Sequence, residues 1–170
     1  VAKTHGNFLV AMGRSTIPII LTDKGTPLFG TPYEFRYGHA DLVRDGKDAA
    51  IITTGGMVCR AVQAWEKLKG KGVEVQILNI PCLSDLDIEA ILKAVRTGTV
   101  VTYEDHHIQT GLGTLIANVL AEHSLPIRFR KMGITQYGSS GKPDDLYQMQ
   151  GLDVESLVQA VLDEIQKDRL

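Results

Sequence analysis

The chain has 170 residues, of which 44% are hydrophobic and 22% are charged, and its formal net charge is -2. This length suits one domain better than two, and the composition is that of an ordinary soluble globular protein. The charge provides no basic field to hold a phosphate backbone, so we expect no nucleic-acid partner. No apolar run approaches the roughly 20 residues that cross a bilayer, so we expect no membrane partner either.

The amino terminus and the two cysteines bear on processing and compartment. The chain starts at Val1 rather than at a methionine, and the residues that follow lack the charged-then-apolar layout of a signal peptide. We therefore expect a fragment or a processed form of a longer protein. Cys59 and Cys82 have no CxxC spacing, and we interpret them as reduced thiols of a cytoplasmic protein.

The amino-terminal part, up to about residue 39, shows no clean periodicity. Residues 8–14 and 17–21 are short pieces that could be extended, and residues 22–38 are rich in Gly, Pro and Thr. A structureless span of this length is improbable inside a compact domain. We interpret it as a linker that wraps one domain and leads from another.

From Asp48 onward, apolar strands alternate with amphipathic helices. The segment 49–54 is short, apolar and rich in β-branched residues, which is typical of a strand buried on both faces. Further strands are predicted over 73–80, 99–104 and 126–134. Helices are predicted over 55–70, 84–95, 111–123 and 143–149, and a last helix after residue 153.

Several residues predict where these helices begin and end. Gly70 is expected to end the first helix, and Ser84 is expected to cap the second, with Asp87 three positions later. Pro143 suits the first turn of a short helix. Two acidic residues in the same turn lie near the positive end of the helix dipole.

The order of these elements predicts an α/β fold. Strands alternating with helices form βαβ units, so the sheet is expected to be mostly parallel and covered by helices on both faces, as a three-layer αβα sandwich. Residues 40–44 and 49–54 flank an Asp-Gly-Lys-Asp turn, which is a hairpin signal. We therefore predict about five strands, with residues 40–44 as one antiparallel edge strand.

Glu104, Asp105, His106 and His107 form the first candidate site. A carboxylate beside an imidazole can perform acid–base chemistry, and open α/β folds bind ligands at the carboxyl ends of parallel strands. Adjacent strand residues point to opposite faces, however, so the four side chains cannot all converge on one atom. We favour a structural role, in which Glu104 and Asp105 bond to loop amides or to a neighbouring domain.

Gly111 and Gly113 stand where a helix is predicted to begin, so free amides there could hold a phosphate. The third glycine of the dinucleotide pattern would fall at Ile116, and no Gly-Lys-Ser/Thr follows. We favour the interpretation that the glycines let the helix start close to the sheet. A free-standing nucleotide-binding domain that uses both glycines remains an alternative.

Three further positions are weaker candidates. Residues 53–56, Thr-Thr-Gly-Gly, could line a ligand crevice, but a tight strand-to-helix turn also accounts for them. Lys142 could meet an anion, and solvent exposure is the expected state. Arg14 precedes the predicted linker, where a guanidinium suits bidentate phosphate binding, although the pattern alone indicates a surface arginine.

Four segments resemble the transketolase family, in chain order. They are "GRSTIPII" (13–20), "GKDAAIITTGGMVCRAVQAWEKL" (46–68), "TVVTYEDHHIQTGLG" (99–113) and "GSSGKPDDLYQMQGLD" (138–153). On these segments the chain is identified as a C-terminal section of a transketolase. The resemblance implies that residues 1–22 end the middle, pyrimidine-binding domain, that 23–39 are an interdomain linker, and that 40–170 are the C-terminal domain.

The resemblance implies a parent enzyme that depends on thiamine diphosphate and Mg²⁺ and transfers a two-carbon ketol unit between sugar phosphates. Cofactor, metal and catalytic residues would lie in domains absent from this chain. Arg14 alone would carry over, as the arginine that grips the substrate phosphate. The implied partners are the N-terminal and middle domains, in the same chain or in a separate subunit, within a homodimeric parent.

Other interpretations remain open. Deoxyxylulose-phosphate synthase and the β chain of 2-oxo acid dehydrogenases end in the same kind of domain. The chain could also be a module that holds subunits together through a sheet edge or a helix face.

Overall fold

The computed structural model describes residues 5–10, 16–22 and 24–166. Its centre is a five-stranded sheet with the strand order β1-β3-β2-β4-β5. The strands are β1 (Asp41–Arg44), β2 (Ala49–Thr53), β3 (Val75–Asn79), β4 (Thr99–His107) and β5 (Arg128–Ile134). The pairs β2–β3, β2–β4 and β4–β5 are parallel, and β1 is antiparallel to β3. The prediction of a mostly parallel sheet with one antiparallel edge strand is confirmed.

The predicted hairpin between β1 and β2 is wrong, because β3 lies between these two strands. β2 is fully buried and pairs on both sides with parallel neighbours, so it has no open edge for β1. The Asp-Gly-Lys-Asp segment instead crosses the start of β3. The amides of Lys47 and Asp48 both donate to the carbonyl of Glu74 at 2.9 Å. A Cβ on Gly46 would lie 2.3 Å from the backbone of Val75, so the crossing needs glycine.

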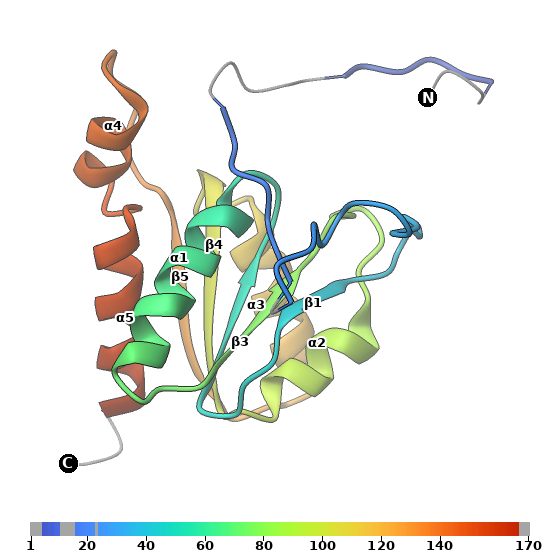
Figure 1. The fold of residues 1–170 in the computed structure, drawn as a ribbon. Coiled ribbons are helices and arrows are strands. Elements are labelled where there is room, and N and C mark those ends of the chain that lie inside the picture. Colours follow the sequence, from blue (N-terminus) through green and yellow to red (C-terminus); the bar gives the residue numbers. More distant parts are fainter. Residues whose placement is uncertain (1–4, 11–15, 23, 167–170) are drawn as a thin grey trace.

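Helices cover both faces of the sheet, which confirms the three-layer αβα sandwich (Figure 1). α1 (Met57–Gly70) and α5 (Val154–Gln166) lie side by side on one face, and α2 (Ile88–Val95) and α3 (Leu112–Glu122) lie on the other. The inward side chains of each strand alternate between two cores. In β2, Ile51 packs on the α1–α5 side and Ile52 on the α2–α3 side.

α2 begins at Ile88, four positions after the predicted cap. The residue that caps it is Asp87, whose Oδ1 accepts from the amide of Ala90 at 3.0 Å. The Ser84 hydroxyl forms a hydrogen bond with that of Tyr37 at 2.8 Å. The prediction that Ser84 caps this helix is therefore wrong. The carboxylate of Asp87, three residues later, accepts the hydrogen bond instead.

α4 (Pro143–Met149) has the predicted bounds and stands beyond the carboxyl edge of the sheet (Figure 1). None of its residues is buried. None of the helices in the described part of the chain has the length and hydrophobicity that spanning a bilayer requires.

Part of the predicted linker is ordered against the domain. Residues 20–22 and 24–28 pair in an antiparallel manner, with Leu28 donating to the carbonyl of Ile20 at 2.8 Å and Thr22 donating to that of Thr26 at 2.7 Å. The side chains of Ile20 and Leu28 pack on the core of the α1–α5 face. The chain therefore lies against this domain at Ile20 and Leu28.

Candidate functional site

The described candidate residues gather at the carboxyl edge of the sheet, next to the segment that leads in from residue 16. A cavity of about 880 Å³ lies between α1, α4 and residues 16–18. A second cavity, of about 360 Å³, lies over the ends of β2 and β4. Arg14, the proposed phosphate-binding residue, lies outside the described residues.

Glu104 joins β4 to the first turn of α3. Its side chain is 1% exposed. Its two carboxylate oxygens accept from the amides of Leu112 at 2.6 Å and Gly113 at 2.8 Å. The negative carboxylate also complements the positive end of the α3 dipole. The predicted bonding of Glu104 to loop amides is therefore confirmed.

This carboxylate explains the two glycines at the start of α3. A Cβ on Gly111 would lie 1.8 Å from Glu104 Oε2, and a Cβ on Gly113 would lie 2.7 Å from Thr102 Oγ1. The glycines let the helix start close to the sheet, as predicted. A phosphate at this helix start would have to displace a buried carboxylate from the same amides.

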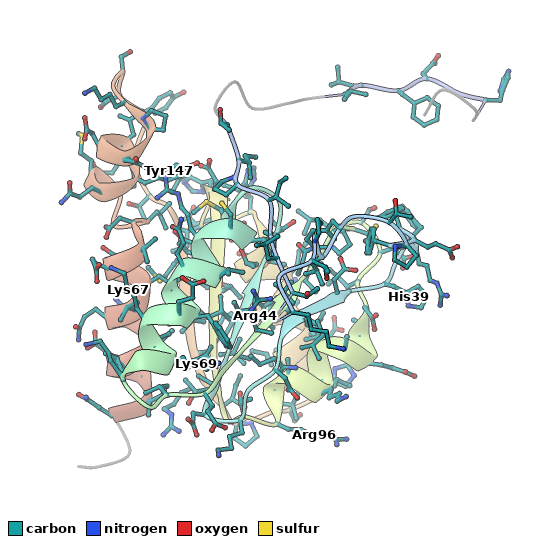
Figure 2. The ribbon with its side chains drawn as sticks, viewed as in Figure 1. His39, Arg44, Lys67, Lys69, Arg96 and Tyr147 are labelled. Atoms are coloured by element: carbon teal, nitrogen blue, oxygen red, sulfur yellow. The ribbon has the colours of Figure 1, made fainter. Side chains whose placement is uncertain are left out.

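Asp105 points away from Glu104 and belongs to a second, more exposed group of side chains. It accepts from the hydroxyl of Tyr147 at 2.7 Å. The guanidinium of Arg60 lies 4.1 Å from the centre of the Tyr147 ring and donates to Asp144 at 2.5 Å. Burial and the hydrogen bond to Asp105 raise the pKa of Tyr147 to about 12. These contacts join α1, β4 and α4. We call Arg60, Asp105, Asp144 and Tyr147 the α4 clamp. Figure 2 shows Tyr147 at the base of α4.

His106 and His107 do not join Glu104 in a common site. Both are exposed. His106 Nε2 lies 3.4 Å from the hydroxyl of Thr110, and His107 Nδ1 accepts from the amide of Gln109 at 3.3 Å. The residues at 104–107 thus have separate partners, as the alternation of side chains along a strand requires.

Residues 53–56 form a tight strand-to-helix turn. The hydroxyls of Thr53 and Thr54 each donate to a carbonyl at 2.7 Å, those of Tyr103 and Ile80 respectively. Gly55 has a φ of 59°, a conformation that favours glycine. These bonds tie together the ends of β2, β4 and the segment after β3, so both hydroxyls are already engaged.

The remaining candidates from the sequence are Lys142 and the two cysteines, and none of them shows a site of its own. Lys142 is exposed, as expected, and lines the larger cavity together with Arg60 and Asp105. Cys59 and Cys82 are free thiols. Burial raises the pKa of Cys59, which disfavours the reactive thiolate.

At the start of α3, the described residues offer no free pair of amides for a diphosphate. The amides at the Gly-Leu-Gly helix start are occupied by Glu104. Across residues 5–10, 16–22 and 24–166, no three His, Cys, Asp or Glu side chains gather to hold a metal ion. No reaction step through thiamine diphosphate or Mg²⁺ therefore follows from this part of the chain.

The amino-terminal segments expose many large apolar side chains. Leu9 is 96% exposed and Ile19 is 74% exposed. Among the described residues 5–10, 16–22 and 24–37, the exposed large apolar side chains are Phe8, Leu9, Val10, Ile17, Ile19, Leu21, Phe29, Tyr33, Phe35 and Tyr37. Residues 5–10 lie apart from the body of the domain (Figure 1). Exposed apolar side chains in this number are candidates for contact with another domain or subunit.

The sheet order and the helices on both faces define an open α/β domain. At the start of its helix α3, the buried Glu104 occupies the backbone amides. The family described as "Transketolase, C-terminal domain" matches residues 38–157. The chain belongs to this family, whose members are in general parts of thiamine diphosphate-dependent enzymes.

One curated relative aligns with nearly the whole chain, and another with about three quarters of it. A Methanocaldococcus jannaschii protein, provisionally named a transketolase C-terminal section, is 34% identical over 99% of this chain and 51% of its own length. One subunit of the apulose-4-phosphate transketolase of Actinobacillus succinogenes is 35% identical over 76% of this chain and 43% of its own length. The chain thus spans about half the length of these curated relatives.

A solved structure and a differently named relative complete the comparison. The split-gene transketolase solved as an inactive beta4 tetramer matches 91% of this chain and 48% of its own, with a TM-score of 0.79 and 28% identity. The 1-deoxy-D-xylulose-5-phosphate synthase of Desulfitobacterium hafniense is 32% identical over 75% of this chain and 20% of its own length.

The α4 clamp was missed by sequence reasoning. Arg60 and Tyr147 lie far apart in the chain, and neither belongs to a motif whose chemistry requires the other. Asp144 was noted only as an acid near a helix start. No local signal pairs these residues, because their contact arises from the packing of α4 over α1.

Proposed function

We propose that the chain is the C-terminal section of a thiamine diphosphate-dependent transketolase, which transfers two-carbon ketol units between sugar phosphates. The observation that carries the proposal is the alignment of 99% of this chain with a relative named as such a section. Glu104, Thr53 and Thr54 support it, because their side chains form hydrogen bonds within the domain. In this proposal they stabilise the fold, and the catalytic residues lie in other domains.

In this proposal the described domain is a docking part. Its partners are the N-terminal and middle domains, in the same chain or in a separate subunit, and the parent is a homodimer in the cytoplasm. The exposed apolar side chains of residues 5–37 supply a surface for such an interface. Two relatives bear names of transketolase subunits, which favours a partner in a second chain.

Arg14 is the residue of this chain that we assign to the substrate. Residues 1–22 then end the middle domain, 23–39 link the two domains and 40–170 form the C-terminal domain. Thiamine diphosphate and Mg²⁺ bind to the missing domains. Arg14 holds the terminal phosphate of the sugar through a planar guanidinium, whose geometry suits bidentate contacts with phosphate oxygens.

A complementation assay tests the proposal. The chain alone, supplied with thiamine diphosphate, Mg²⁺, xylulose 5-phosphate and ribose 5-phosphate, should form no product. Addition of the section that carries the other domains should restore turnover. Arg14→Ala in the assembled enzyme should mainly raise KM for phosphorylated sugars, because a grip far from the reacting atoms supplies largely uniform binding. Robust turnover by the chain alone would falsify the proposal.

A decarboxylating parent is the second candidate, favoured by the relative named 1-deoxy-D-xylulose-5-phosphate synthase. A 2-oxo acid dehydrogenase is the related possibility. Both would release CO2 from a 2-oxo acid, whereas ketol transfer between sugar phosphates releases none. CO2 release by the assembled enzyme from a 2-oxo acid, without ketol transfer, would replace the first candidate with this one.

A further inference from the structure

α4 lies on the domain without burying any of its own residues. It stands beyond the carboxyl edge of the sheet (Figure 1), and its Tyr147 side chain packs, partly buried, against the core of the α1–α5 face. A helix of seven residues is marginal in water by itself. The stability of α4 therefore depends on its contacts with neighbouring elements.

The contacts that hold α4 are largely polar. Tyr147 donates to Asp105, and Asp144 accepts from Arg60, whose guanidinium also lies against the Tyr147 ring. The side chain of Asp144 is 87% exposed. Contacts between exposed charged groups are weakened by solvent and by salt. The α4 clamp is thus weaker than the buried sheet to which it joins α4.

The chain is fixed again immediately after α4. Leu152 is 1% exposed, and the hydroxyl of Tyr103 on β4 donates to its carbonyl. Gly151 lies between this anchor and the helix, with a φ of 65° that favours glycine. Release of the clamp would therefore free α4 and leave Leu152 in place.

The hydrogen bond between Asp105 and Tyr147 stands where three cavities meet. Both residues line the cavity of about 880 Å³ beside α1 and the cavity of about 360 Å³ over the ends of β2 and β4. Both also line a third cavity, of about 260 Å³, between α4 and the end of β5. Tyr147 is therefore part of the wall between these cavities, and its departure with α4 would join them.

We propose that α4 is a flap, that the α4 clamp is its latch, and that opening of the flap joins the three cavities into one cleft at the carboxyl edge of the sheet. The flap opens while the sheet stays folded, because no residue of α4 is buried in either core. Open α/β folds bind ligands at the carboxyl ends of their strands. The flap thus controls access from solvent to this edge.

Hydrogen exchange on the 170-residue chain tests whether α4 opens by itself. The amides of Leu146 and Gln150 form the hydrogen bonds of α4, and the amide of Ile80 bonds to Thr53 in the sheet. The α4 amides should exchange about a hundredfold faster than that of Ile80, because local opening needs less free energy than global unfolding. Equal protection of these amides would overturn the flap, because α4 would then open only with the whole domain.

Two substitutions test the latch. Tyr147→Phe keeps the ring but loses the bond to Asp105, and should raise the exchange rates of the α4 amides by about fivefold. Arg60→Met removes the ion pair and the cation–π contact, and should raise them by about tenfold or more. Tyr137→Phe, at an exposed position before α4, is the matched control and should leave them unchanged. Unchanged α4 rates in both clamp variants would overturn the role of the clamp.

Salt tests the latch in the wild-type chain. Raising the salt concentration from about 0.1 M to about 1 M should speed exchange of the α4 amides, because screening weakens the pair between Arg60 and Asp144. The same change should have little effect on these amides in Arg60→Met. The amide of Ile80 reports any general effect of salt on stability. Wild-type α4 rates that ignore salt would contradict a latch held by charge.

Cys59 reports whether the opening joins the cavities. It lines the cavity of about 880 Å³ together with Tyr147, and its thiol donates to the carbonyl of Gly56. A bulky maleimide should label Cys59 about fivefold faster in Tyr147→Phe than in wild type, in parallel with α4 exchange. The buried Cys82 should keep its labelling rate. If exchange rises and labelling of Cys59 does not, α4 opens without widening the cavity, and the joined cleft is wrong.

Discussion

Two junctions leave the same strand at adjacent residues and differ in almost every physical respect. The inner junction joins β4 to α3 through Glu104, which is buried and bonded by two amides. The outer junction joins β4 to α4 through Asp105, which is exposed and bonded by the hydroxyl of Tyr147. Glu104 thus stabilises the domain from inside, whereas Asp105 lies where a partner domain can reach it.

The contrast between the junctions predicts the greatest loss of stability for Glu104→Ala. The substitution leaves the amides of Leu112 and Gly113 buried without their acceptor and removes a charge from the α3 start. We expect a loss of about 3–5 kcal/mol in the free energy of unfolding. Urea denaturation of the chain measures it. Asp105→Ala, one residue away, is the control and should cost about 1 kcal/mol or less. Equal losses for the two variants would remove the distinction between the junctions.

Gly111→Ala tests the close approach behind the inner junction. The new Cβ would overlap Glu104 Oε2, so the carboxylate or the helix start must move. We expect a loss of about 1–3 kcal/mol, the usual cost of overpacking a well-packed site. Gly138→Ala is the matched control, because a Cβ there meets nothing within 4 Å. Thermal unfolding of both variants measures the loss of stability. An unchanged stability of Gly111→Ala would mean that the start of α3 can shift without cost.

The outer junction predicts a dependence on alkaline pH. Burial and Asp105 raise the pKa of Tyr147 to about 12 in the folded chain, above the value of about 10 in an unfolded one. The neutral phenol is therefore favoured by folding. Its contribution to stability is complete below about pH 10 and is lost as the pH rises through about 12. Urea denaturation between these values should show a steeper fall for wild type than for Tyr147→Phe. Parallel curves would contradict the raised pKa of Tyr147.

A still weaker contribution is expected from the ion pair between Lys67 on α1 and Glu155 on α5. Both side chains are substantially exposed, at 48% and 70%, and Figure 2 shows Lys67 on the side of α1 that faces α5. Lys67→Met should change the free energy of unfolding by about 0.5 kcal/mol or less, because exposed ion pairs are screened by solvent. Urea denaturation at low and high salt measures the change. A loss comparable to that of Gly111→Ala would show that surface ion pairs stabilise this domain as much as its inner junction does.

The sequence predicted what local chemistry determines. The short helix after Pro143 was placed at its observed bounds, because proline and two acids mark a helix start. The structural role of Glu104 followed from strand alternation, and the close helix start followed from Gly111 and Gly113. These features depend on residues within a few positions of one another.

The rest depends on contacts between distant segments. The hairpin signal before Ala49 could not reveal that β3 occupies the neighbouring position. Ser84 and Asp87 are both residue types that cap helices. The Ser84 hydroxyl instead forms a hydrogen bond with that of Tyr37, from a distant segment. The contacts of Arg44 with Leu21, and of Arg60 with Tyr147, follow from the packing of whole elements, which no local pattern encodes.

If this chain docks to domains that hold the reactive groups, the cofactor should bind only to the assembled enzyme. Isothermal titration calorimetry of the isolated chain with thiamine diphosphate and Mg²⁺ should give no binding heat. The same titration of the chain assembled with its partner section should give saturable binding. Saturable binding to the isolated chain, abolished by a substitution within residues 104–113, would show instead that the cofactor site lies in this domain.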